Sequence, residues 1–190
     1  MSRSVSARKP VYHLTMDAMF VALYVILGTF LSFKLPGAIQ VSFSSLPILL
    51  CAFLMGPVDA VAVAVVGNFL EQVIDPSPYG FATLALWLIP GAVQALIAGV
   101  GAKTIRRLPG SRAVEIGLSV PVIVLAELML TLLNTGALYL DGYLLDYPVK
   151  ALHLLMPVRL ANLGVRTLLS CILVPLLLPP LRRVLAKFNR

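Results

Sequence analysis

The sequence has few charged residues, and this shortage excludes most soluble folds. Only 12% of its 190 residues are charged, about half the share in a typical soluble domain, while 59% are hydrophobic. The mean hydropathy is +0.96. A soluble fold of this length has too high a surface-to-volume ratio to bury so much apolar surface. The composition therefore predicts an integral membrane protein surrounded by a lipid bilayer.

Cysteine and histidine are scarce as well, and this removes the usual metal and redox sites. Cys51 and Cys171 lie in apolar runs without ligand spacing, so we interpret them as small core residues. His13 and His153 have no catalytic partner nearby in the sequence. No Walker A, His-Glu-x-x-His or Gly-x-Ser-x-Gly pattern occurs. We expect no catalytic residue, no metal and no cofactor in this chain, and any ATP must be used by a partner polypeptide.

Long apolar runs account for most of the chain. A transmembrane helix needs about 20 residues, so six spans with short loops fill the available length. The expected fold is all-α, a polytopic membrane protein in which residues 1–190 form one six-transmembrane-helix bundle. The spans are expected at residues 13–33, 45–55, 58–74, 79–102, 113–140 and 151–181. The second is the least secure, because it is short for a span.

Positive charge gathers at the predicted span ends. If both termini lie in the cytoplasm (N-in/C-in), eleven of the 15 lysine and arginine residues fall on the cytoplasmic side. These eleven are Arg3, Arg8, Lys9, Lys103, Arg106, Arg107, Arg112, Arg182, Arg183, Lys187 and Arg190. The outer loops carry only Lys34 and Lys150. The positive-inside rule predicts such an excess of basic residues on the cytoplasmic side. The formal charge of +7 is therefore a topology signal and not a nucleic-acid site.

The predicted last span carries polar residues on one face. Arg159, Asn162 and Arg166 are three and four residues apart, which places them on one side of a helix. A buried arginine costs about 2.5–3.5 kcal/mol even on the lenient insertion scale. Two of them imply an anionic ligand, a water-filled cavity or a carboxylate partner. Each arginine therefore either meets a ligand or joins an internal ion pair with Glu71 or Glu127. For Arg159, near the outer end of the span, a third possibility is that its side chain extends to the membrane interface.

Three other predicted spans carry polar or aromatic residues at helical spacing. They are Asn68, Glu71 and Gln72 in the third span, Trp87 and Gln94 in the fourth, and Asn134 in the fifth. Together with Arg159 and Asn162 they predict a pocket that opens outward, with Trp87 stacked on a flat ligand. The alternative is that these side chains clamp neighbouring helices or pack in the core.

The first predicted span carries a pair of small residues in its cytoplasmic half. Ala18 and Ala22 are four residues apart, and such pairs allow two helices to approach closely within a bilayer. They either face another protein or pack inside the bundle.

Seven short motifs, in order along nearly the whole chain, resemble the S components of energy-coupling factor (ECF) vitamin importers. They are Ala18-x-x-x-Ala22, Ser42-Phe43-Ser44-Ser45-Leu46-Pro47, Met55-Gly56-Pro57, Gly67-Asn68-Phe69-Leu70, Gly80-Phe81-Ala82-Thr83-Leu84, Leu133-Asn134-Thr135 and Met156-Pro157-Val158-Arg159-Leu160. The Asn-Thr and Pro-x-Arg elements resemble the folate-type subgroup most. Two positions depart from that subgroup, namely Asn68, where aspartate is frequent, and Asn162, where a second basic residue is frequent.

The resemblance implies a subunit that captures a vitamin from outside the plasma membrane of a prokaryote. The first outer loop would act as a lid, with Lys34, Gln40, Ser42 and Ser44. The alanine pair would contact a transmembrane T subunit, to which two cytoplasmic ATPase subunits are attached. Folate is the first ligand expected, with pantothenate and pyridoxine-type compounds as alternatives. Outside this class, the alternatives are a stand-alone secondary transporter and an assembly protein without a small ligand.

Overall fold

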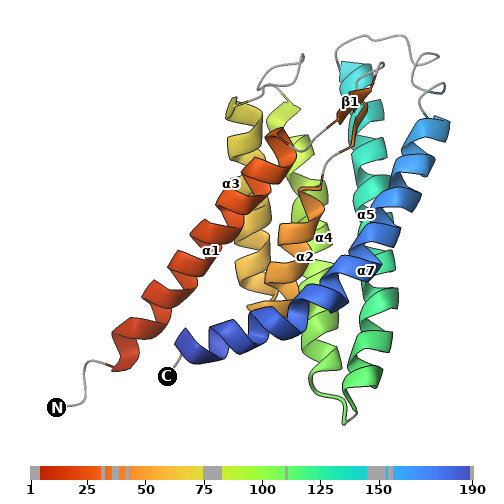
Figure 1. The fold of residues 1–190 in the computed structure, drawn as a ribbon. Coiled ribbons are helices and arrows are strands. Elements are labelled where there is room, and N and C mark those ends of the chain that lie inside the picture. Colours follow the sequence, from red (N-terminus) through yellow and green to blue (C-terminus); the bar gives the residue numbers. More distant parts are fainter. Residues whose placement is uncertain are drawn as a thin grey trace.

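Six helices and a short hairpin form the part of the chain that the structure describes (Figure 1). The structure is a computed structural model that describes residues 5–30, 33–35, 39–41, 43–74, 83–109, 111–144, 153 and 156–188. The helices are α1 (Val5–Thr29), α2 (Ser45–Leu54), α3 (Pro57–Ile74), α4 (Leu84–Ile105), α5 (Arg112–Leu144) and α7 (Met156–Phe188). Both termini lie at one end of the bundle, here called the terminal end, and the hairpin lies toward the other, the hairpin end (Figure 1).

Five of the described helices are long and apolar enough to cross a membrane, so the chain is a multi-pass membrane protein. The sixth is α2, a helix of 10 residues that lies where the second span was predicted, at 45–55. At 1.5 Å per residue it is about 15 Å long, half the thickness of the hydrocarbon layer. Most of its residues are buried, and it contacts α1, α3, α4 and α7. The six helices of the described residues thus match the predicted number, but α2 is too short to cross the lipid by itself and is surrounded by protein.

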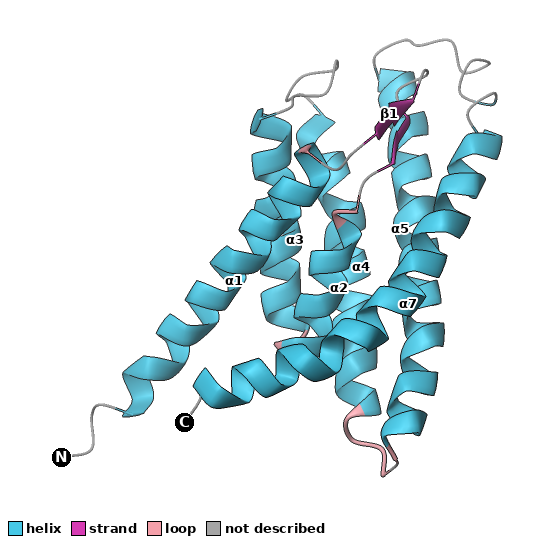
Figure 2. Ribbon diagram, viewed as in Figure 1, coloured by secondary structure: helices cyan, strands magenta, loops and turns pink. Residues whose placement is uncertain are grey.

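The predicted lid loop contains a structure that the all-α prediction missed. Strands β1 (Phe33–Leu35) and β2 (Ile39–Val41) form an antiparallel hairpin, drawn in magenta in Figure 2. Lys34 and Gln40, two of the predicted lid residues, are partners in its register. The hairpin also contacts α7 through β2. Of the other two lid residues, Ser44 directly precedes α2, and Ser42 lies outside the described residues.

Several helix ends differ from the predicted span limits. The first helix ends at Thr29 instead of 33, and α5 continues to Leu144 instead of ending at 140. The predicted start of the fourth span, at 79–82, lies outside the described residues. The Gly56-Pro57 turn was predicted correctly, because α2 ends just before it and α3 begins at Pro57. Gly56 has a φ of +123°, a conformation that residues with a side chain rarely adopt.

Small residues bring α3 and α4 together. Ala60, Ala64 and Ala98 are fully buried between these helices and their neighbours. A Cβ added to Gly99 of α4 would overlap Cα of Pro57, the first residue of α3. Small side chains let backbones approach closely where lipid removes most of the hydrophobic driving force between helices. The packing of this helix pair therefore depends on the absence of a side chain at position 99.

The replacement of Gly99 with alanine is expected to destabilise the protein. The new methyl group would meet backbone atoms, which cannot move aside as the tip of a flexible side chain can. Overpacking of this kind costs about 1–3 kcal/mol, so the melting temperature in detergent should fall by several degrees. The matched control is Gly117→Ala in α5, where nothing lies within 4 Å of the added Cβ. A melting temperature that is equal for both variants would contradict the close packing of α3 and α4.

Candidate functional site

A buried ion pair joins the middle of α5 to α7. Nε of Arg166 donates to Oε2 of Glu127 at 2.6 Å, and Nη2 donates to the hydroxyl of Thr131 at 2.9 Å. The hydroxyl of Ser170 donates to the second carboxylate oxygen of Glu127 at 3.1 Å. Glu127 is 0% exposed. Both oxygens of the carboxylate are therefore satisfied, and the internal ion pair considered from the sequence exists for Arg166.

The second arginine of α7 has a different environment. Nη1 of Arg159 donates to the hydroxyl of Thr135 at 3.0 Å. Among the ion pairs between described residues, none includes Arg159. Further toward the hairpin end, the hydroxyl of Tyr139 lies 3.0 Å from Nδ1 of His153. Arg159 thus carries a half-buried positive charge whose described hydrogen bond is to a neutral group.

Together these contacts form a polar seam between α5 and α7, which runs from Tyr139 toward the middle of the bundle. Asn134 and Asn162, the other predicted site residues on these helices, are half-buried. The hydroxyls of Thr131 and Thr135 were missed as acceptors, although the Asn134-Thr135 motif pointed to the second. The seam consists of Glu127, Thr131, Thr135 and Tyr139 from α5 and of Arg159, Arg166 and Ser170 from α7, with His153 at its end.

The predicted site residues of α3 make contacts with neighbouring helices. The amide of Asn68 donates to the backbone carbonyl of Trp87 in α4 at 2.9 Å. The carboxylate of Glu71 faces α1, where a Cβ added to Gly28 would lie 2.7 Å from one of its oxygens. Asn68 therefore links α3 to α4, and Glu71 contacts α1. Gln72 is half-buried on the same helix.

Several buried polar atoms lie in α4 and in Thr83, the residue before it. They have no hydrogen-bond partner among the described residues. They are both amide atoms of Gln94, which is 0% exposed, Nε1 of Trp87 and the hydroxyl of Thr83. Offsets of four and seven residues place the three side chains near one face of the helix. An unsatisfied buried polar group costs about 1–3 kcal/mol, so native proteins usually satisfy it with water or a ligand. This face of α4 is consequently able to form hydrogen bonds with a bound molecule.

Asp141 follows the span expected at 113–140, so that prediction placed it in an outer loop, but it lies inside the bundle. It belongs to the last turn of α5 and is 1% exposed. Neither carboxylate oxygen has a hydrogen-bond partner among the described residues. It follows Asn134 by seven residues, so both lie near the same face of α5. The signal was hidden because Asp141 follows the apolar run directly and precedes a glycine, which is typical of a loop.

The predicted alanine pair lies on the outside of the bundle. Ala18 and Ala22 are exposed, as is Leu14 at the same four-residue spacing. The opposite side of α1 is buried through Phe20 and Tyr24. Packing of the pair inside this bundle is thereby ruled out, and the exposed face is free to contact lipid or another protein.

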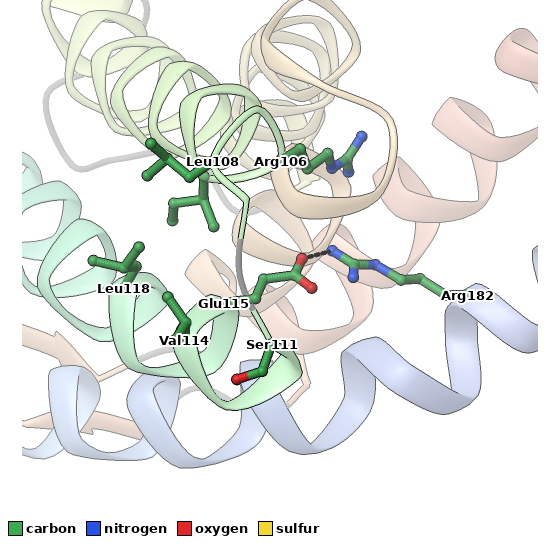
Figure 3. Close-up of a pocket in the computed structure, with 8 residues that line it drawn as sticks. Arg106, Leu108, Ser111, Val114, Glu115, Leu118 and Arg182 are labelled. Atoms are coloured by element: carbon green, nitrogen blue, oxygen red, sulfur yellow. Dashed lines mark hydrogen bonds and ion pairs between the residues drawn. The ribbon is translucent and has the colours of Figure 1, made fainter.

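A cavity of about 400 Å³ lies elsewhere, at the terminal end between α4, α5 and α7. Its lining consists of Ile105, Arg106, Leu108, Ser111, Val114, Glu115, Leu118 and Arg182, most of which are labelled in Figure 3. None of the residues predicted to bind a ligand belongs to it. The predicted site is therefore defined by the polar groups of α3, α4, α5 and α7, and this cavity is a separate feature.

The helices and their enclosed polar groups define a multi-pass membrane protein with polar sites inside the bundle. Over residues 13–178 the chain matches the family model of the ECF transporter substrate-specific component. The chain belongs to this family, whose members are transporter components and not enzymes. The resemblance found in the sequence is confirmed at this level.

A solved structure with a similar fold is described as the S component of a bacterial ECF transporter. It shares 23% sequence identity and a TM-score of 0.56 with this chain, over 95% of this chain and 99% of that one. The comparison with curated proteins gives no significant match.

Proposed function

We propose that this chain captures a small anionic vitamin from outside the cell, with folate-type compounds as the first candidates. The polar groups at the hairpin end would form the binding site, and the hairpin would close over it. Arg159 would bind a carboxylate, and Trp87 would stack on a ring. The hydrogen bonds would come from the polar residues Asn68, Glu71, Gln72, Gln94, Asn134 and Asn162.

The enclosed amide of Gln94 is the observation that carries this proposal. It is fully buried, and its nitrogen and oxygen have no partner among the described residues. In an apolar bundle such a group is costly unless another molecule binds it. Arg159 adds a positive charge whose described hydrogen bond is to the hydroxyl of Thr135. A polar molecule with an acidic group would satisfy both.

We also propose how the chain is oriented in the membrane and which partner subunits supply the energy for transport. The chain would lie in the plasma membrane of a prokaryote with both termini in the cytoplasm. Figure 1 supports an even number of crossings because both termini lie at one end, and the hairpin and α2 together would make the second crossing. The terminal end also carries most of the basic residues, as expected of a cytoplasmic side. The exposed alanine face of α1 would contact a T subunit, and two ATPase subunits would use the ATP.

An Ala22→Leu variant is expected to retain vitamin binding and to lose ATP-driven uptake. The larger side chain would project from an exposed face, so the bundle should remain intact while a close helix contact is blocked. Binding is measured by thermal shift of the purified chain against a panel of vitamins. Uptake is measured in cells that also express a T subunit and both ATPases.

The control for this variant is made on α1 itself. Leu23 is the next residue and is also exposed, so Leu23→Ala alters the outer surface of the helix without adding bulk. This control should bind and transport like the wild type. A wild-type chain that no vitamin stabilises would contradict the proposed function. Uptake by the chain alone in proteoliposomes would instead indicate a secondary transporter.

A further inference from the structure

The cavity at the terminal end combines a charged side with an apolar side. Figure 3 shows Arg182 and Glu115 joined by an ion pair, with Leu108, Val114 and Leu118 grouped away from that pair. Nη2 of Arg182 and Oε1 of Glu115 are 2.6 Å apart. The apolar residues are substantially exposed, with Leu108 at 52% and Val114 at 47%. The lining is therefore amphipathic.

The charged side has an excess of positive charge. Arg106 and Arg182 line it together with a single carboxylate, that of Glu115. The guanidinium of Arg106 donates to the carbonyl oxygens of Phe53 and Leu54 at the end of α2. Burial and the neighbouring Arg182 lower the pKa of Arg106, whereas Glu115 raises it. Two guanidinium groups and one carboxylate leave one net positive charge in the lining, which a bound anion would offset.

The backbone adds to the attraction for an anion. Ser111 lines the cavity, and the 33-residue helix α5 begins immediately after it, at Arg112. The first N–H groups of a helix lack partners within the helix and carry the positive end of its dipole. An anionic oxygen within the cavity would therefore face two guanidinium groups and a helix N-terminus.

The apolar side of the cavity continues along the surface of α5. Val114, Leu118, Leu125 and Leu132 are all exposed, and their spacings of four and seven residues place them on one face of the helix. From the first to the last, the stripe is about 27 Å long at 1.5 Å per residue, close to the thickness of the hydrocarbon layer. An acyl chain could follow this stripe from the cavity into the membrane, whereas a free anion would gain nothing from it.

We propose that the cavity between α4, α5 and α7 binds the phosphodiester headgroup of an anionic phospholipid. Arg106 and Arg182 hold the phosphate, and the acyl chains lie along the apolar stripe of α5. Basic pockets between transmembrane helices bind anionic headgroups by this combination of charge and apolar contact. The site is separate from the vitamin site, so this inference does not depend on the proposed function.

Native mass spectrometry of the purified full chain tests this inference. The protein is incubated with equal amounts of dioleoyl phosphatidylglycerol and dioleoyl phosphatidylcholine, and the lipid that stays bound is counted. We expect the wild type to retain the anionic lipid preferentially. Arg182→Gln should weaken retention by about fivefold, because each arginine near an anionic headgroup contributes on the order of that factor. Glu115→Gln should strengthen retention, since it releases Arg182, and misfolding would not produce such a gain.

The matched control is Arg183→Gln, which removes the same charge from the next residue. Arg183 is exposed and does not line the cavity, so its variant should retain the lipid as the wild type does. An equal loss in Arg182→Gln and Arg183→Gln would show general charge attraction and would overturn the assignment. Displacement of the lipid by millimolar inorganic phosphate would also overturn it, because the anion would then bind without its acyl chains.

Discussion

The replacement of Arg159 with glutamine is expected to weaken the binding of a carboxylate ligand at least tenfold. Removal of one partner of a buried, hydrogen-bonded charge pair costs about 2–5 kcal/mol, and each 1.4 kcal/mol is a factor of ten in Kd. Arg159 fits this case because it is half-buried and makes no ion pair with a described residue. The measurement is a titration by isothermal calorimetry with the vitamin found by the thermal-shift panel.

Two further variants separate charge from geometry at this position. Arg159→Lys keeps the charge but loses the planar donor pair, so it should recover only part of the affinity. Thr135→Val removes the hydroxyl that accepts from Arg159 and should weaken binding by a smaller factor. Arg183→Gln, at the other end of the bundle, is the control for a lost cation and should bind normally. An unchanged Kd for Arg159→Gln would exclude carboxylate recognition by this residue.

The spacing of polar residues predicted which side of each helix carries them, but it could not predict which residues on other helices they contact. Positions 159 and 166 were placed on one face, and both arginines do contact α5. The spacing could not decide which of them meets a carboxylate, because Glu71 and Glu127 were equally available along the chain. In the structure Glu127 pairs with Arg166, while Glu71 faces Gly28 of α1. Which carboxylate pairs with which arginine depends on which helices are neighbours in the fold.

The short elements were the least predictable from the sequence. In lipid, both the inside and the outside of a bundle are apolar, so hydropathy cannot distinguish the enclosed helix α2 from a span. The useful signal was the short apolar run of the span expected at 45–55, which is too short to cross a bilayer. The hairpin has strands of only three residues, too short to show the alternation of side chains that identifies a strand.

Loss of the buried ion pair between Glu127 and Arg166 is expected to lower the stability of the protein strongly. Arg166→Met is expected to destabilise the protein by about 3–5 kcal/mol, since it leaves the carboxylate of Glu127 unpaired in the core. Glu127 is 0% exposed, so water cannot compensate for the lost partner. Thermal unfolding in detergent would measure the change as a marked fall in melting temperature.

The double variant Glu127→Gln/Arg166→Met distinguishes a structural pair from a ligand contact. With both charges removed no unpaired ion remains, and most of the lost stability should return, because apolar replacements of buried pairs are often neutral or stabilising. Arg166 and Glu127 satisfy each other, with Thr131 and Ser170 completing their hydrogen bonds. The double variant should therefore bind the vitamin nearly as the wild type does. A stable double variant that has lost binding would place this pair in contact with the ligand, and Arg159 would then not be the sole positive group that recognises it.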